Sequence, residues 1–180
     1  MRVFIALEIP DRTKDNLARS ARQFESLATK GNFTVKDNYH ITLHFIGNVD
    51  ESKLIYLQSA MDNIKDCVAP TLSVSQFAVL RASNVVCAKF NKEQNLVRLH
   101  EALGDSLEKL GFTVERRAYR PHVTMIRNYG FTLPFSEVTK SVDVYNKPFT
   151  AANVVLYQSV FTQNGVSYNK LYEVSLKTEQ

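Results

Sequence analysis

The chain of 180 residues contains little cysteine: Cys67 and Cys87 are its only two. Neither their number nor their spacing suits a disulfide framework or a zinc site, which excludes the small disulfide-rich secreted domains and the zinc-finger classes. We expect two free thiols in a protein of the reducing cytoplasm. A chain of this length buries roughly two-thirds of the surface that its unfolded form exposes, so covalent cross-links are not needed.

Long apolar runs are also missing. The opening MRVFIALEIP has one basic residue and a short apolar stretch that soon meets Glu8 and Pro10, which predicts a first strand and neither a signal peptide nor a membrane span. No low-complexity segment or charged tail indicates a linker. A glycine-rich phosphate loop and a Ser or Cys nucleophile elbow are absent as well. We therefore expect no membrane partner and no nucleophilic catalysis.

Positive charge is only slightly in excess. Lys and Arg number 22 and Asp and Glu 18, for a net charge of +4, which is mild for a nucleic-acid-binding protein and agrees equally with a solubility feature. Four arginines nevertheless fall within twelve residues: Arg116, Arg117, Arg120 and Arg127. A solvated charged segment and a phosphate-attracting surface both stay open as interpretations of this cluster.

One four-residue pattern occurs twice, as His40-Ile41-Thr42-Leu43 and as His122-Val123-Thr124-Met125. Successive side chains of a β-strand point to opposite faces, so in each copy the His and Thr share one face and the two apolar residues share the other. The same alternation places His44 on the face of His40 and turns Arg127 away from His122. Each copy is therefore predicted to be a strand with one polar face and one core face.

The two histidines lie 82 residues apart, and the surrounding sequence supports this offset. The offset also aligns other residues of the two halves: Val3 with Val85, Ala6 with Ala88 and Leu17 with Leu99. A strand, a helix and a His-bearing strand follow in the same order in both halves. We interpret residues 2–46 and 84–128 as two copies of one supersecondary unit within a single two-lobed domain, 1–180.

Helical periodicity predicts helices over residues 11–30, 51–66 and 96–110, with Asp11 as an N-cap and with Gly31 and Gly111 as stops. Alternation and β-branched content predict strands over residues 2–9, 40–46, 72–80, 85–90, 122–127, 154–161 and 171–176. The predicted class is α+β. Helices on the outer faces of two antiparallel sheets would leave the inner faces, with the histidines, on either side of a central groove.

Paired imidazoles point to acid–base chemistry, because a group with a pKa of about 6.5 gains and loses protons near neutrality. Thr42 and Thr124 add small neutral donors suited to phosphate oxygens. This combination favours phosphoester hydrolysis without a metal, and we expect no cofactor. A zinc site is a weaker hypothesis, since neither motif has an Asp, Glu or Cys two or four residues away.

Three neighbouring side chains have more than one interpretation. His44 would be a third metal ligand, a substrate contact or a partly exposed strand residue, and we favour the last. Tyr39 and Tyr119 flank the two motifs and would either stack on a base or pack beneath the groove, and we favour packing.

With their flanks, the motifs resemble those of a known family. The segments that carry the resemblance are RVFIALEIP (2–10), NYHITLHFIG (38–47) and RPHVTMIR (120–127). They are similar to the two-histidine phosphoesterases and most similar to the LigT-like RNA 2′,3′-cyclic phosphodiesterases, also called 2′-5′ RNA ligases. The resemblance covers nearly the whole chain. It implies a bilobal, pseudo-symmetric α+β fold with both motifs lining a central groove.

The resemblance also implies a reaction, which is metal-independent opening of a terminal RNA 2′,3′-cyclic phosphate to a 2′-phosphate, with reversible 2′-5′ ligation in some members. By resemblance His40 is the general acid that protonates the departing 3′ oxygen, His122 is the general base, and Thr42 and Thr124 hold phosphate oxygens. Arg127 matches a phosphate-contacting arginine, a role that requires a β-bulge or the end of the strand to turn it into the groove. The residues alone leave open which histidine is the acid.

Two alternatives to this function stay open. One is a phosphodiesterase that acts on another cyclic phosphate or on a 2′-5′-linked oligonucleotide. The other is a non-catalytic module that binds RNA ends, for which two matched imidazoles have no purpose. We favour the RNA-end phosphodiesterase, with RNA or a nucleotide as its partner, and small size favours a monomer.

Overall fold

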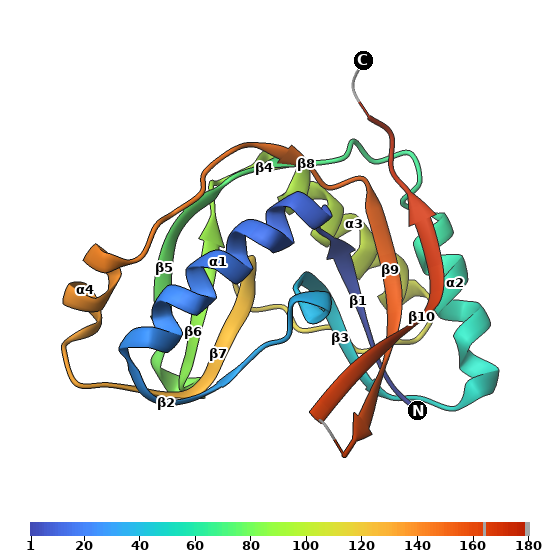
Figure 1. Cartoon of the computed structure of the whole chain (residues 1–180). Coiled ribbons are helices and arrows are strands. Elements are labelled where there is room, and N and C mark those ends of the chain that lie inside the picture. The colour runs from blue at the N-terminus through green and yellow to red at the C-terminus, as the bar shows by residue number, and fades with distance from the viewer. Residues whose placement is uncertain (164, 179–180) are drawn as a thin grey trace.

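The computed structural model describes residues 1–163 and 165–178. Two four-stranded antiparallel sheets form two lobes (Figure 1). The first sheet, in the order β10-β9-β1-β3, consists of β1 (Arg2–Glu8), β3 (His40–Asn48), β9 (Asn153–Thr162) and β10 (Gly165–Ser175). The second, in the order β2-β7-β6-β5, consists of β2 (Ala28–Phe33), β5 (Val74–Leu80), β6 (Val85–Phe90) and β7 (His122–Phe131). A small sheet pairs β4 (Thr71–Leu72) with β8 (Phe149–Thr150).

The helices connect the two sheets crosswise. The α-helices are α1 (Asp11–Leu27), α2 (Leu54–Asp62), α3 (Gln94–Lys109) and α4 (Phe135–Val138), and 3-10 turns occupy Lys36–Asn38, Glu51–Lys53, Arg81–Ser83 and Thr139–Ser141. Helix α1 follows β1 of the first sheet but packs on β2 and β7 of the second, and α3 follows β6 of the second sheet but packs on β3 of the first (Figure 1). The predicted α+β class with antiparallel sheets is confirmed, and the crossed helices hold the two lobes together.

Aromatic and leucine side chains fill the space between helices and sheets. Phe24 of α1 is fully buried and meets the edge of Phe77 from β5, with ring centroids 5.1 Å apart. On α3, Leu99, Leu103 and Leu107 are fully buried, because their spacing of four residues places them on one side of the helix. The predicted stripes are therefore core within both helices, but Leu110 at the end of the second stripe is 36% exposed.

The first helix is shorter than predicted. It ends at Leu27 and not at Lys30, because Ala28–Phe33 pairs with β7 as β2. A Cβ atom on Gly31 would lie 2.7 Å from the Ile126 side chain, so this glycine allows a close approach between strands and does not stop a helix. Pro10 is the N-cap and Asp11 the first helical residue, so the prediction of Asp11 as cap is wrong.

Other predicted boundaries are also wrong, including that of the strand predicted over 122–127, which continues to Phe131 as β7. The helix predicted over 51–66 is a 3-10 turn followed by α2, which ends at Asp62. The strand predicted over 72–80 breaks at Ser73, whose backbone N–H donates to Asn91 Oδ1 at 2.7 Å. Strand β10 begins at Gly165, six residues before the predicted start at Leu171, because pairing with β9 and not apolar alternation defines it.

Both proposed repeat units contain a strand, a helix and a His-bearing strand in the same order, β1-α1-β3 and β6-α3-β7. The first unit also contains β2, whose counterpart in the second is irregular chain. The boundaries of the duplication stay a prediction. Cys67 is half-buried and Cys87 buried, and both are free thiols. In the part of the chain described, no helix has the length and apolar character that crossing a membrane requires.

Candidate active site

A β-bulge in β3 controls which side chains face the space between the sheets. Ala6 of β1 pairs with Thr42, and the residue before it, Ile5, pairs with His44. Leu43 is therefore the extra residue of β3. The bulge reverses the two faces of the strand beyond it. His44 is therefore only 5% exposed, and Phe45 is 53% exposed. The prediction that His44 shares the face of His40 and Thr42, as a partly exposed strand residue, is wrong.

The second motif has a bulge at the matching position. Val86 of β6 pairs with Ile126 and Cys87 pairs with Thr124, which makes Met125 the extra residue. Arg127 consequently faces the same side as Thr124 and His122, as its phosphate-contacting role would require. Met125 lies 82 residues after Leu43, so the two bulges occur at the same offset as the two motifs.

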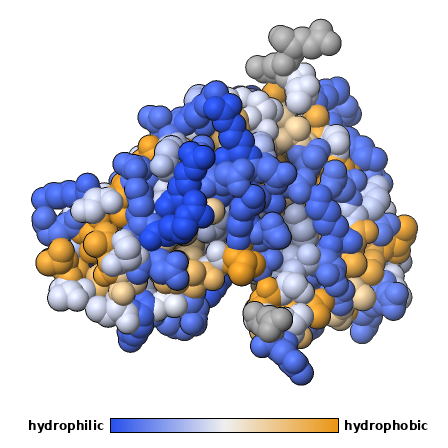
Figure 2. Space-filling model, viewed as in Figure 1, coloured by the Kyte–Doolittle hydropathy of each residue, from blue (hydrophilic) through white to orange (hydrophobic). Residues whose placement is uncertain are grey.

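The two motifs line one cleft of about 460 Å³ between the sheets. Its polar lining includes His40, Thr42, His122, Thr124, Arg127, Arg2, Thr34, Asn38 and Ser159. Aromatic rings from the first sheet form much of the remaining wall: Phe4, Phe45, Phe161 and Tyr168. Figure 2 shows the molecular surface indented at its lower edge between the lobes of Figure 1. All five predicted site residues therefore meet in one cleft.

His40 is held by hydrogen bonds to Asn38 and Thr42 and by aromatic neighbours. Its Nδ1–H donates to the Asn38 carbonyl oxygen at 2.7 Å, which leaves Nε2 as the acceptor for the Thr42 hydroxyl at 3.1 Å. The rings of Phe4 and Tyr168 lie 4.8 and 5.2 Å from its centroid. Burial among these rings lowers the pKa of His40 to about 4, and the charge of the nearby His122 adds to the effect. His40 is therefore neutral at pH 7.

His122 is oriented in the same way. Its Nδ1–H donates to the Arg120 carbonyl oxygen at 2.8 Å. Arg120 lies two residues before His122, just as Asn38 lies two residues before His40. Because a carbonyl oxygen only accepts, both rings carry a proton on Nδ1. In both motifs Nε2 is thus the nitrogen that can exchange a proton with a ligand, and in His40 this requires the Thr42 hydroxyl to turn away from the ring.

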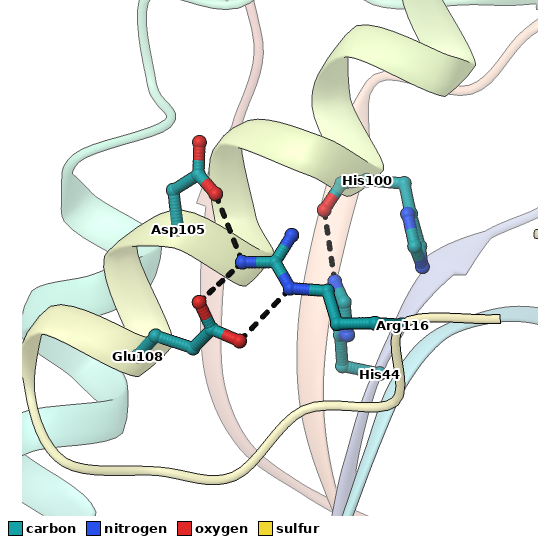
Figure 3. A network of polar contacts seen from close by, with 5 residues as sticks. All are labelled: His44, His100, Asp105, Glu108 and Arg116. Atoms are coloured by element: carbon teal, nitrogen blue, oxygen red, sulfur yellow. Dashed lines mark hydrogen bonds and ion pairs between the residues drawn. The ribbon is translucent and has the colours of Figure 1, made fainter.

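His44 belongs to a column of stacked rings behind the cleft. Its Nε2–H donates to the His100 carbonyl oxygen at 2.8 Å, and its ring lies 4.2 Å from that of His100 (Figure 3). His100 in turn stacks on Tyr119 at 3.9 Å. A Cβ atom on Gly104 would lie 3.2 Å from the His44 ring, so a glycine lets α3 approach it. His44 thus joins α3 to β3 and is no ligand in the cleft.

The arginine cluster of the sequence divides into structural and cleft residues. Arg116 donates to Asp105 at 3.0 Å and to Glu108, and these carboxylates raise its pKa (Figure 3). Arg117 pairs with Glu115. Both interpretations of the cluster thus apply in part, because these two guanidinium groups pair with protein carboxylates and Arg127 lines the cleft.

Arg2, which lines the cleft, and Lys14, which lies outside its lining, are two basic residues that the sequence predictions missed. Arg2 stands over the ring of Phe45, 4.9 Å from its centroid. Lys14 of α1 is only 8% exposed, and its charge contributes to the low pKa of His40. An arginine at the second position of a sequence is only a weak signal of a cleft residue. Lys14 gives no such signal, because its helix is distant in sequence from both motifs. Among the described residues, no cluster of three His, Cys, Asp or Glu side chains could hold a metal.

Comparison with known proteins identifies the family. Residues 7–87, which include the first motif, match the family model described as LigT like Phosphoesterase. The RNA 2′,3′-cyclic phosphodiesterase of Methanocaldococcus jannaschii is 30% identical over 96% of this chain and 99% of its own length, so the match covers both motifs. The chain belongs to the LigT-like phosphoesterase family. The family resemblance of the sequence is confirmed.

Other members of the LigT-like family support this result. The RNA 2′,3′-cyclic phosphodiesterase of Bacillus subtilis is 27% identical over 87% of this chain and 89% of its own length. The crystal structure of Escherichia coli LigT complexed with 3′-AMP has a TM-score of 0.83, with 23% identity over 97% of both chains. This structural likeness shows that the two-lobed fold is shared.

Tyr119 is a positioning residue between the motifs. Its hydroxyl donates to the Thr42 carbonyl oxygen at 2.9 Å, and the next residue, Arg120, orients His122. We expect Tyr119→Phe to lower the free energy of unfolding by about 1–2 kcal/mol, because the Thr42 carbonyl loses its partner. Looser alignment of the two strands should lower kcat about tenfold. Denaturant unfolding and steady-state kinetics measure the two effects.

The matched control is Tyr129→Phe, which removes a half-buried hydroxyl from β7. It should change neither quantity appreciably. Wild-type kcat in Tyr119→Phe would show that the contact has no influence on the motifs.

Proposed function

We propose that this protein hydrolyses RNA 2′,3′-cyclic phosphate ends to 2′-phosphates without a metal. One observation carries the proposal: two imidazoles that each donate Nδ1–H to a backbone carbonyl, two threonine hydroxyls and Arg127 line one cleft. A cyclic phosphate is a monoanion that needs a base on one side and an acid on the other. The curated relatives carry the name of this activity.

His122 is the proposed base and His40 the proposed acid. Nε2 of His122 takes a proton from water as the water oxygen bonds to phosphorus. The bond from phosphorus to the 3′ oxygen breaks, and Nε2–H of His40 protonates the departing oxygen. Solvent exchange then returns both rings to their starting states. Thr42, Thr124 and Arg127 hold the non-bridging oxygens, and Arg127 offsets the charge that develops there.

The low pKa of His40 is a constraint on this assignment. A neutral His40 cannot protonate a leaving group, so its Nε2 must gain a proton when the substrate is bound. An anion about 4 Å away contributes about 4 kcal/mol at an effective dielectric constant of about 20, enough to raise a pKa by about three. The phosphate therefore supplies the field that turns His40 into an acid at neutral pH.

The deciding experiment incubates the purified protein with an RNA fragment that ends in a 2′,3′-cyclic phosphate, in the presence of a chelator. We expect a product heavier by one water, with a phosphate on the 2′ oxygen that a phosphatase removes. Mass spectrometry and comparison with 2′- and 3′-phosphate standards identify it. Omitting the chelator and adding Mg²⁺ is the control for metal dependence.

The other outcomes separate the alternatives. A 3′-phosphate would reverse the choice of leaving oxygen and contradict the role of His40. RNA that binds without turnover would favour the non-catalytic module, and turnover only of other cyclic phosphates or 2′-5′-linked oligonucleotides would favour the second enzyme. Slow formation of a 2′-5′ linkage with a 5′-hydroxyl RNA would show that the reaction reverses.

We infer in addition that the protein is a cytoplasmic monomer. Cys67 and Cys87 are free thiols, which agrees with a reducing compartment. The cleft is built from the residues of one chain. A mass in solution near twice the 20.5 kDa of the chain would contradict the monomer.

A further inference from the structure

A second pocket shares His122 with the cleft. It has a volume of about 520 Å³ and lies between the end of β6, the start of α3 and the segment that leads into β7. Because His122 lines both spaces, the pocket and the cleft adjoin at this ring. We call it the Lys92 pocket.

The Lys92 pocket is positively charged. Lys89, Lys92 and Arg120 line it, and within the described part of the chain none of the three makes a salt bridge. Glu93 is the single carboxylate in its lining, and it accepts hydrogen bonds from the backbone N–H groups of Asn95 and Leu96 at the start of α3. The three cations are thus available to an anionic ligand from solution.

The rest of the lining is apolar and partly aromatic. Phe90 and Leu96 are buried and contribute to the wall, and Val97 is 40% exposed beside them. Tyr119 also lines the pocket, supported by its stack on His100. A flat apolar group next to an anion complements this combination, and a nucleotide has both, with its base and its phosphate.

We propose that the Lys92 pocket binds the nucleotide that precedes the terminal one in an RNA strand. This inference rests on the proposed function, since it requires a cyclic phosphate end in the cleft. Its volume lies within the range of sites that enclose small ligands. The phosphate that links the last two nucleotides then lies near the three cations, and the preceding base packs on the apolar wall.

The experiment compares two substrates with the same terminal nucleotide. One is a nucleoside 2′,3′-cyclic phosphate, and the other a dinucleotide that ends in it. We expect a lower KM for the dinucleotide, and Lys92→Glu should raise that KM about tenfold while kcat/KM for the mononucleotide stays within about twofold. Raising the salt concentration should weaken the wild-type preference for the dinucleotide, because a phosphate contact releases counterions.

Two further variants complete the test. Val97→Glu should act like Lys92→Glu, because it places a negative charge at the apolar wall. Lys109→Glu makes the same charge change at the far end of α3 and should leave both substrates unaffected. Since Lys92, Val97 and Lys109 are all exposed, unchanged turnover of the mononucleotide also reports an intact fold.

The results distinguish this proposal from the proposed function. Turnover of the mononucleotide without preference for the dinucleotide would overturn the Lys92 pocket and leave the function standing. Equal losses for both substrates in Lys92→Glu would overturn it too, because the lysine would then act on the cleft. No turnover of either substrate would overturn the function and this site together.

Discussion

Replacing either His40 or His122 by alanine is expected to lower kcat by about two to four orders of magnitude, since in the proposed mechanism each ring transfers a proton. KM should change much less, because Thr42, Thr124 and Arg127, the proposed phosphate contacts, are still present. Steady-state kinetics with an RNA 2′,3′-cyclic phosphate measure both quantities. Near-normal turnover in both single variants would exclude acid–base catalysis by this pair.

His100→Phe is the matched control for the loss of an imidazole. His100 lies outside the cleft lining, and phenylalanine keeps the stack between His44 and Tyr119. His44 donates to the backbone carbonyl of His100, so its hydrogen bond survives the change. Wild-type kcat in this variant would tie the losses above to the two motifs, and a comparable loss would show a general sensitivity to histidine replacement.

Acid is expected to destabilise this protein between about pH 6.5 and pH 4. Burial lowers the pKa values of His40 and His100 to about 4, and burial lowers that of His44 as well. In the unfolded chain the same groups bind protons below about pH 6.5. The unfolded state therefore binds more protons throughout this interval, and stability present above pH 6.5 is lost as the pH falls towards 4.

The expected loss is on the order of 4 kcal/mol, a large part of the stability of an ordinary domain. Denaturant unfolding at a series of pH values measures it. His100→Phe should reduce the loss by about a third to a half, because it removes one titrating ring and keeps the stack. A free energy of unfolding that stays constant from pH 7 to pH 4.5 would show that the histidines do not titrate as their burial requires.

Local patterns predicted much of the fold. The leucine stripe over 96–110 and the stop at Gly111 correspond to α3, which ends at Lys109 with Gly111 at a φ of +86°. Strand β6 occupies the predicted residues, 85–90. These features follow from the period of apolar residues and from a glycine that adopts positive φ, and both are properties of short segments.

The missed elements depend on partners far along the chain. Strand β2 has the polar sequence ATKGNF and is a strand because β7 supplies its hydrogen bonds. Helix periodicity continues into these residues, so a local criterion extends α1 too far. In β10, polar residues interrupt the alternation of apolar and polar residues that predicts a strand. Pairing with β9 makes this segment a strand nevertheless. Tertiary pairing outweighs intrinsic preference in both cases.

The sequence by itself determined the five candidate site residues, the order of strand, helix and strand in each half, and the family. Only the tertiary structure decided which way His44 and Arg127 face and what pKa His40 has. The bulges arise where β3 and β7 pair with β1 and β6, and a one-residue slip in pairing exchanges the faces of a strand. Desolvation of His40 likewise depends on rings from β1 and β10, which no neighbouring residue specifies.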